Sequence, residues 1–337
     1  MSKKNETIPL LLSLVITAGI IGAISWWIIG RLELNGNEQE TQTPSQTLAE
    51  VKDVPSGLFS YGGSTTWAPI RRDIDPVIQS VRPNFRLRYT DPTTGAPGSG
   101  SGIKMLLNHQ LAFSQSSRSV KETEHQQASQ KGFTLKEIPV ALDGIAVAVH
   151  PDLNISGITV VQLKEIYTGK ITNWSQVGGP NLPIVPYSRR IEEGGTIEFF
   201  VEAVLEGENF GQNVEFIPTT TLALRQVSET LGSIYYASAP EVVPQCTVKS
   251  LPLGRKVGEW VTPYQEPFVP LSQCPQQRNQ LNQTAFQSGD YPITRRLFVI
   301  VKRNGEADEQ AGIAYANLLL TRQGQDLITQ AGFVSIR

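Results

Sequence analysis

The sequence contains few of the side chains on which metal and nucleophilic chemistry depend. There are only two cysteines and three histidines among 337 residues. His109, His125 and His150 are scattered, with no cysteine or carboxylate at the spacing of a metal site. No Gly-x-Ser-x-Gly motif marks a nucleophilic serine. We therefore expect a protein that is not an enzyme and that holds no metal or cofactor.

Charge is also scarce. Charged residues make up 18% of the chain, with 29 Lys and Arg against 31 Asp and Glu, whereas soluble domains usually reach about 25%. No basic tract favours nucleic acid, and no block of like charge forms a tail. A small anion needs no basic protein, because local dipoles and one or two guanidinium groups can hold it.

One hydrophobic run stands out near the N-terminus. Residues 8–30 are apolar except for three hydroxyl residues, and Lys3 and Lys4 precede them. A membrane-spanning helix needs roughly 20 apolar residues, and Trp26 and Trp27 lie where interfacial aromatics are favoured. The pattern predicts an uncleaved anchor with the remainder exported to the periplasmic side. A cleaved signal peptide, leaving a soluble periplasmic protein, is the alternative.

The two cysteines, Cys246 and Cys274, both lie in the part predicted to be exported. An oxidising compartment favours a structural disulfide between them, and two free buried thiols are the alternative. No cysteine precedes Cys246, which excludes a lipoprotein anchor.

Residues 31–56 are polar, with many Gln and Thr, and predict a flexible linker before a folded domain at 57–337. In that domain apolar runs alternate with amphipathic segments, which is typical of an α/β fold. The expected strands are 58–61, 85–89, 111–114, 138–149, 233–237 and 296–301. The expected helices are 67–81, one following Gly102, 119–130, 161–167, 196–205, 311–320 and 324–330.

Four short segments place Ser, Thr or Gly at expected helix starts. They are 63–66, 98–102, 116–119 and 190–196. A helix start carries free backbone N–H groups and partial positive charge, and small residues let an anion approach them. Arginines accompany two of these segments. Together they predict a site for a desolvated tetrahedral oxyanion.

A recognisable series of motifs runs along the chain in this order: GGSTTWAPI, GSGSGI, FSQSSR, DGIAVAVH, LKEIYTGKITNW, RRIEEGGTIEFF, YPITRRLFVIVK and GQDLITQAGFV. The chain thereby resembles the phosphate-binding proteins of phosphate ABC importers over nearly all of 57–337. The resemblance implies a two-lobed, type II-like periplasmic-binding fold that closes by a hinge of two crossover strands. It implies one lobe at 57–142 plus 292–337 and the other at 143–291.

The resemblance also implies the ligand contacts. The matching positions are Thr65, Thr66, Ser99, Ser101, Ser117, Arg118, Arg190, Gly195 and Thr196. Ser99 and Ser101 could instead satisfy backbone turns, and Arg118 could cap a helix or bridge the lobes. Arg189 and Arg190 are adjacent, so only one can point into a cleft, and the spacing to Thr196 favours Arg190.

The chain departs from the family pattern at points that bear on selectivity. Some relatives have an Asp where Ser117 stands, and that carboxylate accepts the proton which phosphate carries and sulfate lacks. Asp143 and Glu193 are candidate substitutes, with an interlobe structural carboxylate and a solvated loop residue as the respective alternatives. Tyr235 replaces a glycine, so a bulky ring is expected at the pocket rim.

These observations predict a monomeric, membrane-held protein that binds inorganic phosphate between two lobes and delivers it to an ABC permease. Affinity would come from many charge-assisted hydrogen bonds made when the lobes close. A binding protein for another tetrahedral oxyanion, such as sulfate or molybdate, is one alternative. A membrane-anchored phosphate sensor without a transport role is another.

Overall fold

The structure is a computed structural model that describes residues 46–191 and 194–337. The expected anchor at 8–30 and residues 31–45 of the expected linker lie outside these ranges. Within them, no helix has the length and apolar character needed to cross a membrane.

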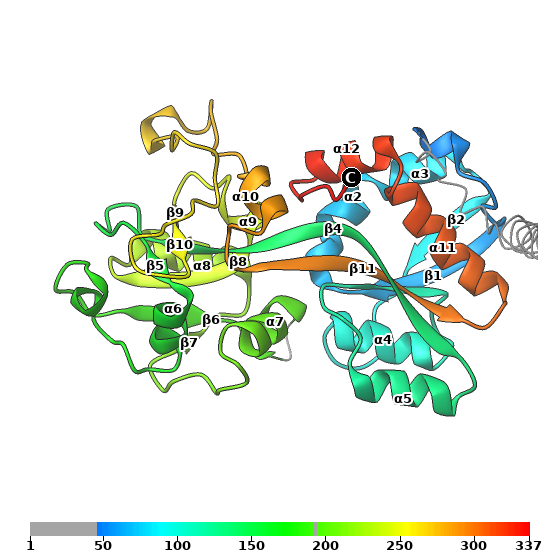
Figure 1. Ribbon diagram of the computed structural model, residues 1–337, viewed down its shortest axis with the longest axis horizontal. Helices are drawn as coiled ribbons and strands as arrows, with labels where there is room; N and C mark the ends of the chain where they lie inside the picture. The colour runs from blue at the N-terminus through cyan, green and yellow to red at the C-terminus, as the bar shows by residue number, and fades with distance from the viewer. Residues whose placement is uncertain (1–45, 192–193) are drawn as a thin grey trace, which may run out of the picture. The chain divides into compact units, whose positions relative to one another are not determined.

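The described chain folds as an α/β protein around a nine-stranded mixed sheet, in the order β2-β1-β3-β11-β4-β8-β6-β7, with β9 beside β4 (Figure 1). The strands of one end are β1 (Gly57–Gly63), β2 (Phe85–Tyr89) and β3 (Phe113–Ser116), all parallel. Those of the other end are β6 (Val185–Ser188), β7 (Glu215–Phe216), β8 (Ser233–Ser238) and β9 (Lys249–Leu251). A separate pair joins β5 (Ile158–Thr159) to β10 (Leu253–Gly254).

Two long strands pass from one end of the sheet to the other. β4 (Thr134–Val149) pairs with β11 (Thr294–Arg303) as far as Gly144, and its last residues, from Ile145, pair with β8 (Figure 1). The strands expected at 138–149 and 296–301 are therefore confirmed, and each is longer than its apolar run.

The helices divide between two lobes, each with its own hydrophobic core. The first lobe carries η1 (Leu48–Glu50), η2 (Thr65–Trp67), α2 (Ala68–Asp73), α3 (Asp75–Val81), α4 (Ser99–Leu107), α5 (Glu122–Gln130), α11 (Ala307–Leu319) and α12 (Arg322–Gln330). The second carries α6 (Val160–Tyr167), η3 (Trp174–Val177), α7 (Gly195–Ala203), α8 (Thr220–Glu229), α9 (Ala239–Val242), η5 (Leu271–Gln273) and α10 (Gln283–Ser288).

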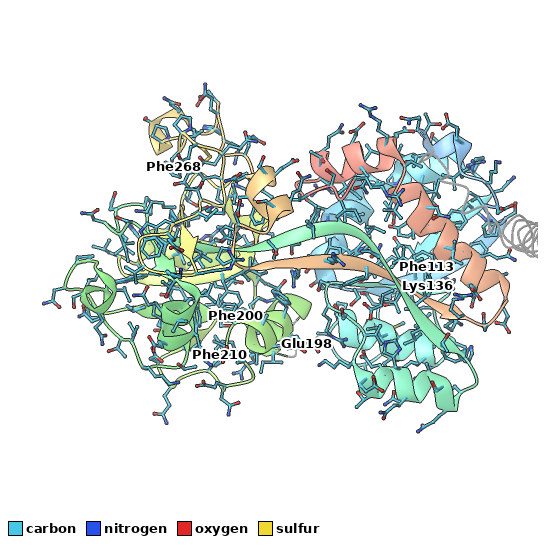
Figure 2. The ribbon with its side chains drawn as sticks, in the orientation of Figure 1. Phe113, Lys136, Glu198, Phe200, Phe210 and Phe268 are labelled. Atoms are coloured by element: carbon cyan, nitrogen blue, oxygen red, sulfur yellow. A yellow bond between two sulfur atoms is a disulfide. The ribbon has the colours of Figure 1, made fainter. Side chains whose placement is uncertain are left out.

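Stacked aromatic rings mark the two cores. In the first lobe the Phe113 ring stacks on Tyr315, with ring centroids 4.8 Å apart. In the second lobe the Phe200 ring stacks on Tyr236, and both side chains are buried. Figure 2 shows Phe113 and Phe200 toward opposite ends of the two long strands β4 and β11. The two-lobed fold expected from the resemblance is thus present.

The expected linker is wrong over its last residues, because part of it is packed on the first lobe. Leu48 is fully buried and Val51 is 6% exposed. The guanidinium of Arg82 donates to the carbonyl oxygens of Leu48, Ala49 and Val51. These two apolar side chains hold the segment on the lobe together with the Arg82 hydrogen bonds, since each buries surface that water would otherwise contact.

The single helix expected over 67–81 is also wrong. The chain forms η2, α2 and α3 in succession, with the break at Ile74. Pro76 lies in the first turn of α3 and has no N–H to donate to the preceding turn, so it marks a new helix start.

The disulfide expected between Cys246 and Cys274 is present. It closes a segment of the second lobe with a sequence separation of 28 residues. Sequence patterns had not indicated β6, α8, α9 or α10, which belong to this lobe.

Candidate functional site

The first contribution to the site is the turn between β1 and α2. Ser64 caps η2, and its hydroxyl oxygen accepts from the backbone N–H of Thr66 at 3.3 Å. The indole of Trp67 donates to the carbonyl of Ser116, and Arg71 donates to the carbonyl of Ser64 at 3.0 Å. The turn that presents Thr65 and Thr66 is therefore held from two sides.

The second contribution is the start of α4, which begins at Ser99 rather than after Gly102. Ser99 is fully buried, and its hydroxyl oxygen accepts from the backbone N–H of Ser117 at 3.1 Å. The Ser101 hydroxyl donates to the carbonyl of Gly98, which is the local turn contact that the sequence left open.

Three serine hydroxyls meet beside these two helix starts. Ser64 Oγ donates to Ser117 Oγ at 2.9 Å, and Ser99 Oγ lies 3.2 Å from Ser117 Oγ. All three residues are completely buried. We call Ser64, Ser99 and Ser117 the serine cluster. Its hydroxyls can donate or accept, so it can adapt to ligands that differ in protonation.

The second lobe brings the start of α7 against the serine cluster. A Cβ atom at Gly195 would lie 2.8 Å from Ser117 Oγ and 2.9 Å from Ser99 Oγ, so only glycine allows this approach. The next residue, Thr196, places its hydroxyl oxygen 3.3 Å from that of Thr66. Helix starts of both lobes therefore meet at one point.

A buried ion pair lies next to this meeting point. Arg295 on β11 and Asp143 on β4 are direct cross-strand neighbours, with side chains 2% and 0% exposed. Arg295 donates to Asp143 Oδ2 from Nε and Nη2, at 2.9 and 2.7 Å, and Ser238 Oγ donates to Asp143 Oδ1 at 2.6 Å. Both carboxylate oxygens of Asp143 therefore accept from neighbouring side chains, which fits the alternative of an interlobe structural carboxylate.

Arg118 bridges the lobes. It forms a two-point contact with Glu124 of α5, at 2.8 and 3.0 Å, and its Nε donates to Glu198 of α7 at 3.2 Å. Burial by itself lowers the pKa of Arg118, but the hydrogen bonds to Glu124 and the charge of Glu198 raise it overall. Its donors thus go to carboxylates of both lobes and to the carbonyl of Ser119.

The two adjacent arginines differ in their surroundings in the structure. Arg189 lines the pocket described below. Arg190 is exposed, with its guanidinium 5.2 Å from the centre of the Phe216 ring. The sequence favours Arg190 for the cleft, whereas Arg189 is the arginine that lines this pocket, because spacing along the chain does not decide which of two successive side chains turns inward. Glu193 lies outside the described residues.

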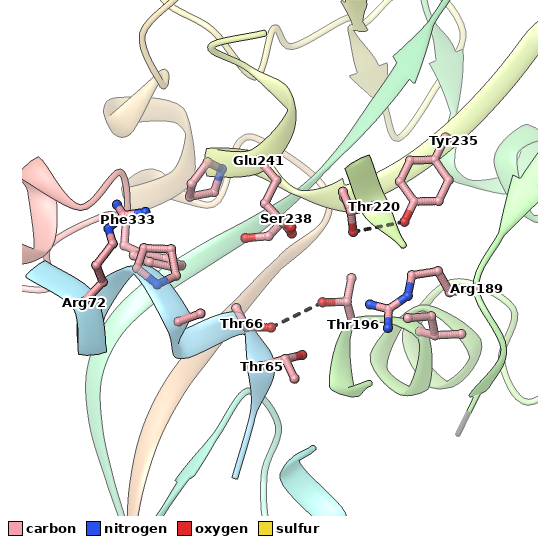
Figure 3. A pocket seen from close by; sticks show the side chains of 15 residues that line it. Thr65, Thr66, Arg72, Arg189, Thr196, Thr220, Tyr235, Ser238, Glu241 and Phe333 are labelled. Atoms are coloured by element: carbon pink, nitrogen blue, oxygen red, sulfur yellow. Dashed lines mark hydrogen bonds between the residues drawn. The ribbon is translucent and has the colours of Figure 1, made fainter. Parts of the chain in front are cut away.

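A pocket of about 520 Å³ opens beside the threonines (Figure 3). Both lobes line it, with Thr65, Thr66, Arg72 and Phe333 from the first and Arg189, Thr196, Thr220, Tyr235, Ser238 and Glu241 from the second. The Tyr235 hydroxyl lies 3.3 Å from the Thr220 hydroxyl, and the ring is among the pocket walls, as the substitution for glycine predicted.

The chain has recognisable relatives. A family model described as a PBP superfamily domain matches residues 39–323, which is most of the sequence.

The chain belongs to the PBP superfamily.

The individual relatives have modest sequence identity to this chain. Protein SphX of Synechococcus elongatus is 26% identical over 288 residues, covering 83% of this chain and 77% of SphX. The phosphate-binding protein PstS of Staphylococcus haemolyticus is 25% identical over 277 residues, covering 81% and 79%. An ABC-type phosphate transport receptor from Vibrio cholerae matches the fold with a TM-score of 0.63 at 21% identity, over 82% of this chain and 99% of that one.

Within this PBP-superfamily fold, most of the residues expected at the site come together. Thr65, Thr66, Ser99, Ser117, Gly195 and Thr196 converge on the meeting point of the helix starts. Among residues 46–191 and 194–337, no group of His, Cys, Asp and Glu is arranged to hold a metal ion.

Two residues of the site were missed in the sequence. Ser64 belongs to the expected helix start at 63–66 but is not among the expected ligand contacts. Arg295 directly precedes the apolar run RLFVIV at 296–301 and is buried within the same strand. A charge there is costly unless it is paired, and this was the signal that could have identified it.

Proposed function

We propose that this protein binds inorganic phosphate between its two lobes and delivers it to the membrane subunits of an ABC-type phosphate importer. Membership of the PBP superfamily supports a ligand-binding role. Relatives named phosphate-binding protein PstS, in Staphylococcus haemolyticus and Pseudomonas aeruginosa, support phosphate as the ligand. Catalysis has no part in the proposal.

The observation that carries the proposal is the meeting of helix starts from both lobes. The serine cluster, Thr66, Gly195 and Thr196 place hydroxyl and backbone N–H groups around one point. Such donors, together with the partial positive charge of helix starts, suit a compact oxyanion removed from water. Because the donors come from both lobes, a bound anion would stabilise the closed form.

The proposed ligand contacts follow this geometry. Donors would come from Thr65, Thr66, Ser99, Ser117, Gly195 and Thr196, with Ser101 as a neighbour of the second helix start. For the guanidinium of the second lobe the structure favours Arg189 over Arg190. Arg118 would contribute by holding the lobes together.

We also propose that the protein acts on the periplasmic side of the cytoplasmic membrane. The apolar run at 8–30 supports an uncleaved anchor, and cleavage to a soluble protein is the alternative. The lobes would be divided near 142–145 and 291–294, where β4 changes its partner from β11 to β8. The protein would act as a monomer that opens and closes about these strands and delivers the anion to the permease.

Sulfate is the second ligand to test. A carboxylate at the position of Ser117 would reject sulfate, whereas the Ser117 hydroxyl does not. The experiment is isothermal titration of the full-length protein in mild detergent, freed of bound ligand, with phosphate and then sulfate at pH 8. Tight phosphate binding that excess sulfate leaves unchanged supports the proposal. Equal binding of sulfate, or no phosphate binding, overturns phosphate specificity while leaving the fold intact.

A further inference from the structure

The guanidinium of Arg295 contacts more groups than its ion pair requires. Besides Asp143, its Nη2 donates to Thr66 Oγ1 and to Thr196 Oγ1, each at 3.0 Å, and its Nη1 donates to the carbonyl of Gly195 at 3.2 Å. The Phe199 ring lies 5.2 Å from its central carbon. One side chain of β11 therefore touches the turn of the first lobe and the start of α7 in the second.

These contacts fix which way the threonine hydroxyls can donate. An arginine has only donors, so each threonine oxygen that faces Arg295 must accept. The hydrogen of each hydroxyl then points away from the guanidinium. One of the two hydrogens can lie between Thr66 and Thr196, whose oxygens are 3.3 Å apart. At least one hydrogen is left to donate to a group in the cleft.

We infer that Arg295 is a positioning residue for the oxyanion, which orients the Thr66 and Thr196 hydroxyls as donors while Asp143 holds its guanidinium in place. The inference rests on the proposed function and adds a residue to the same site. A hydrogen bond from a charged donor also polarises each hydroxyl, which strengthens its bond to an anion. The planar fork matters, because it reaches Asp143 and both threonines at once.

The neighbouring Arg296 provides a matched control. It is on the same strand, one residue further along, and it is exposed, whereas Arg295 is 5% exposed. Arg295→Lys keeps the charge and loses the fork, and Arg296→Lys makes the same chemical change away from the site. Both variants would be made in the full-length protein in mild detergent, with inorganic phosphate and sulfate as probes.

We expect Arg295→Lys to weaken phosphate binding by about tenfold or more, because two charge-assisted contacts lose their geometry. Arg296→Lys should bind as the wild type does. Wild-type affinity in Arg295→Lys would overturn the inference alone. A wild-type protein that binds neither phosphate nor sulfate would overturn the proposed function as well, so the two failures are distinguishable.

A double-mutant cycle separates positioning from a purely structural role. Thr66→Val and Thr196→Val together remove the hydroxyls through which Arg295 is inferred to act. In that background Arg295→Lys should cost little further affinity, so the losses are not additive. Full additivity would show that Arg295 acts by another route and would overturn the inference. Thermal melts without ligand check that each variant is folded.

Discussion

At the scale of single residues, the approach of α7 to the serine cluster depends on a missing side chain. Gly195 approaches the serine cluster so closely that a methyl group has no room, because the nearest atoms are the buried Ser117 and Ser99 hydroxyls. Closure over the site is thus limited by one position at the start of α7.

Gly195→Ala should therefore weaken phosphate binding by about tenfold or more, since overpacking of this kind typically costs 1–3 kcal/mol. Calorimetric titration measures the effect. Gly100→Ala is the control, because its Cβ would meet Arg118 only at 3.4 Å, an ordinary contact. Equal affinities for both variants would show that α7 does not close on the serine cluster when the anion is bound.

The two adjacent arginines give a second prediction at this scale. Arg189→Met should weaken phosphate binding by about tenfold or more, because a charged partner of the anion is lost, whereas Arg190→Met should have little effect. The same titration compares them. The opposite ranking would mean that Arg190 turns inward once ligand is present.

How far the site could be predicted also becomes clear at this scale. Serine, threonine and glycine at helix starts were recognisable because their function depends on local chain geometry, as at Thr66, Ser99 and Gly195. Arg118 contacts Glu198, which is 80 residues away in the chain, and Arg295 contacts Asp143, which is 152 residues away. No local pattern encodes such pairs.

At the scale of elements, η1 shows how a short segment can join a lobe. Its Leu48 side chain is fully buried although the surrounding sequence is polar. Leu48→Ala should lower the free energy of unfolding by about 2–4 kcal/mol, as for other buried leucines. Leu58→Ala, at a side chain 50% exposed, should cost less than about 1 kcal/mol. Urea unfolding of both variants measures the difference, and equal losses would contradict the packing of η1.

The start of α3 contributes a buried acid to the first lobe. Burial raises the pKa of Asp75 to about 6, although hydroxyls of Tyr61 and Tyr315 donate to it. An unfolded Asp has a pKa near 3.9. Between these values the folded protein binds a proton that the unfolded chain has lost, so the stability contributed by this group falls as pH rises from about 4 to 6 and is constant above.

Asp75→Asn removes that titration. The unfolding free energy of the wild type, minus that of the variant, should fall by about 2–3 kcal/mol between pH 4 and 7. Urea unfolding at several pH values measures both. Parallel curves would show that Asp75 does not hold a raised pKa.

Elements were predictable where a single tendency dominated the sequence. The apolar runs of β4 and β11 and the periodicity of α6 and α11 were sufficient. The predictions failed where one residue overrides its neighbours, as Pro76 does between α2 and α3. They also missed short strands such as β6, with only four residues, whose pairing is decided by distant partners.

At the scale of the whole molecule, the disulfide belongs to one lobe, and neither of its cysteines lines the pocket. Replacing Cys246 and Cys274 together by serine should lower the free energy of unfolding by roughly 3–4 kcal/mol, the loop-closure value for a 28-residue separation. Phosphate affinity should change less than about twofold, because no site contact is removed. Urea unfolding and calorimetry on the same sample test both parts, and a large loss of affinity would tie the segment to the cleft.

The position of Arg295 along β11 has a mechanical consequence. It stands opposite Asp143, beside Gly144, where β4 leaves β11 for β8. Atoms close to the axis of a lobe rotation move least when the lobes separate. Rotation of the lobes about these strands would carry Thr196 away while leaving the Arg295–Asp143 pair nearly unchanged. The arriving anion would then meet an Arg295 guanidinium that Asp143 already holds in place before the lobes close.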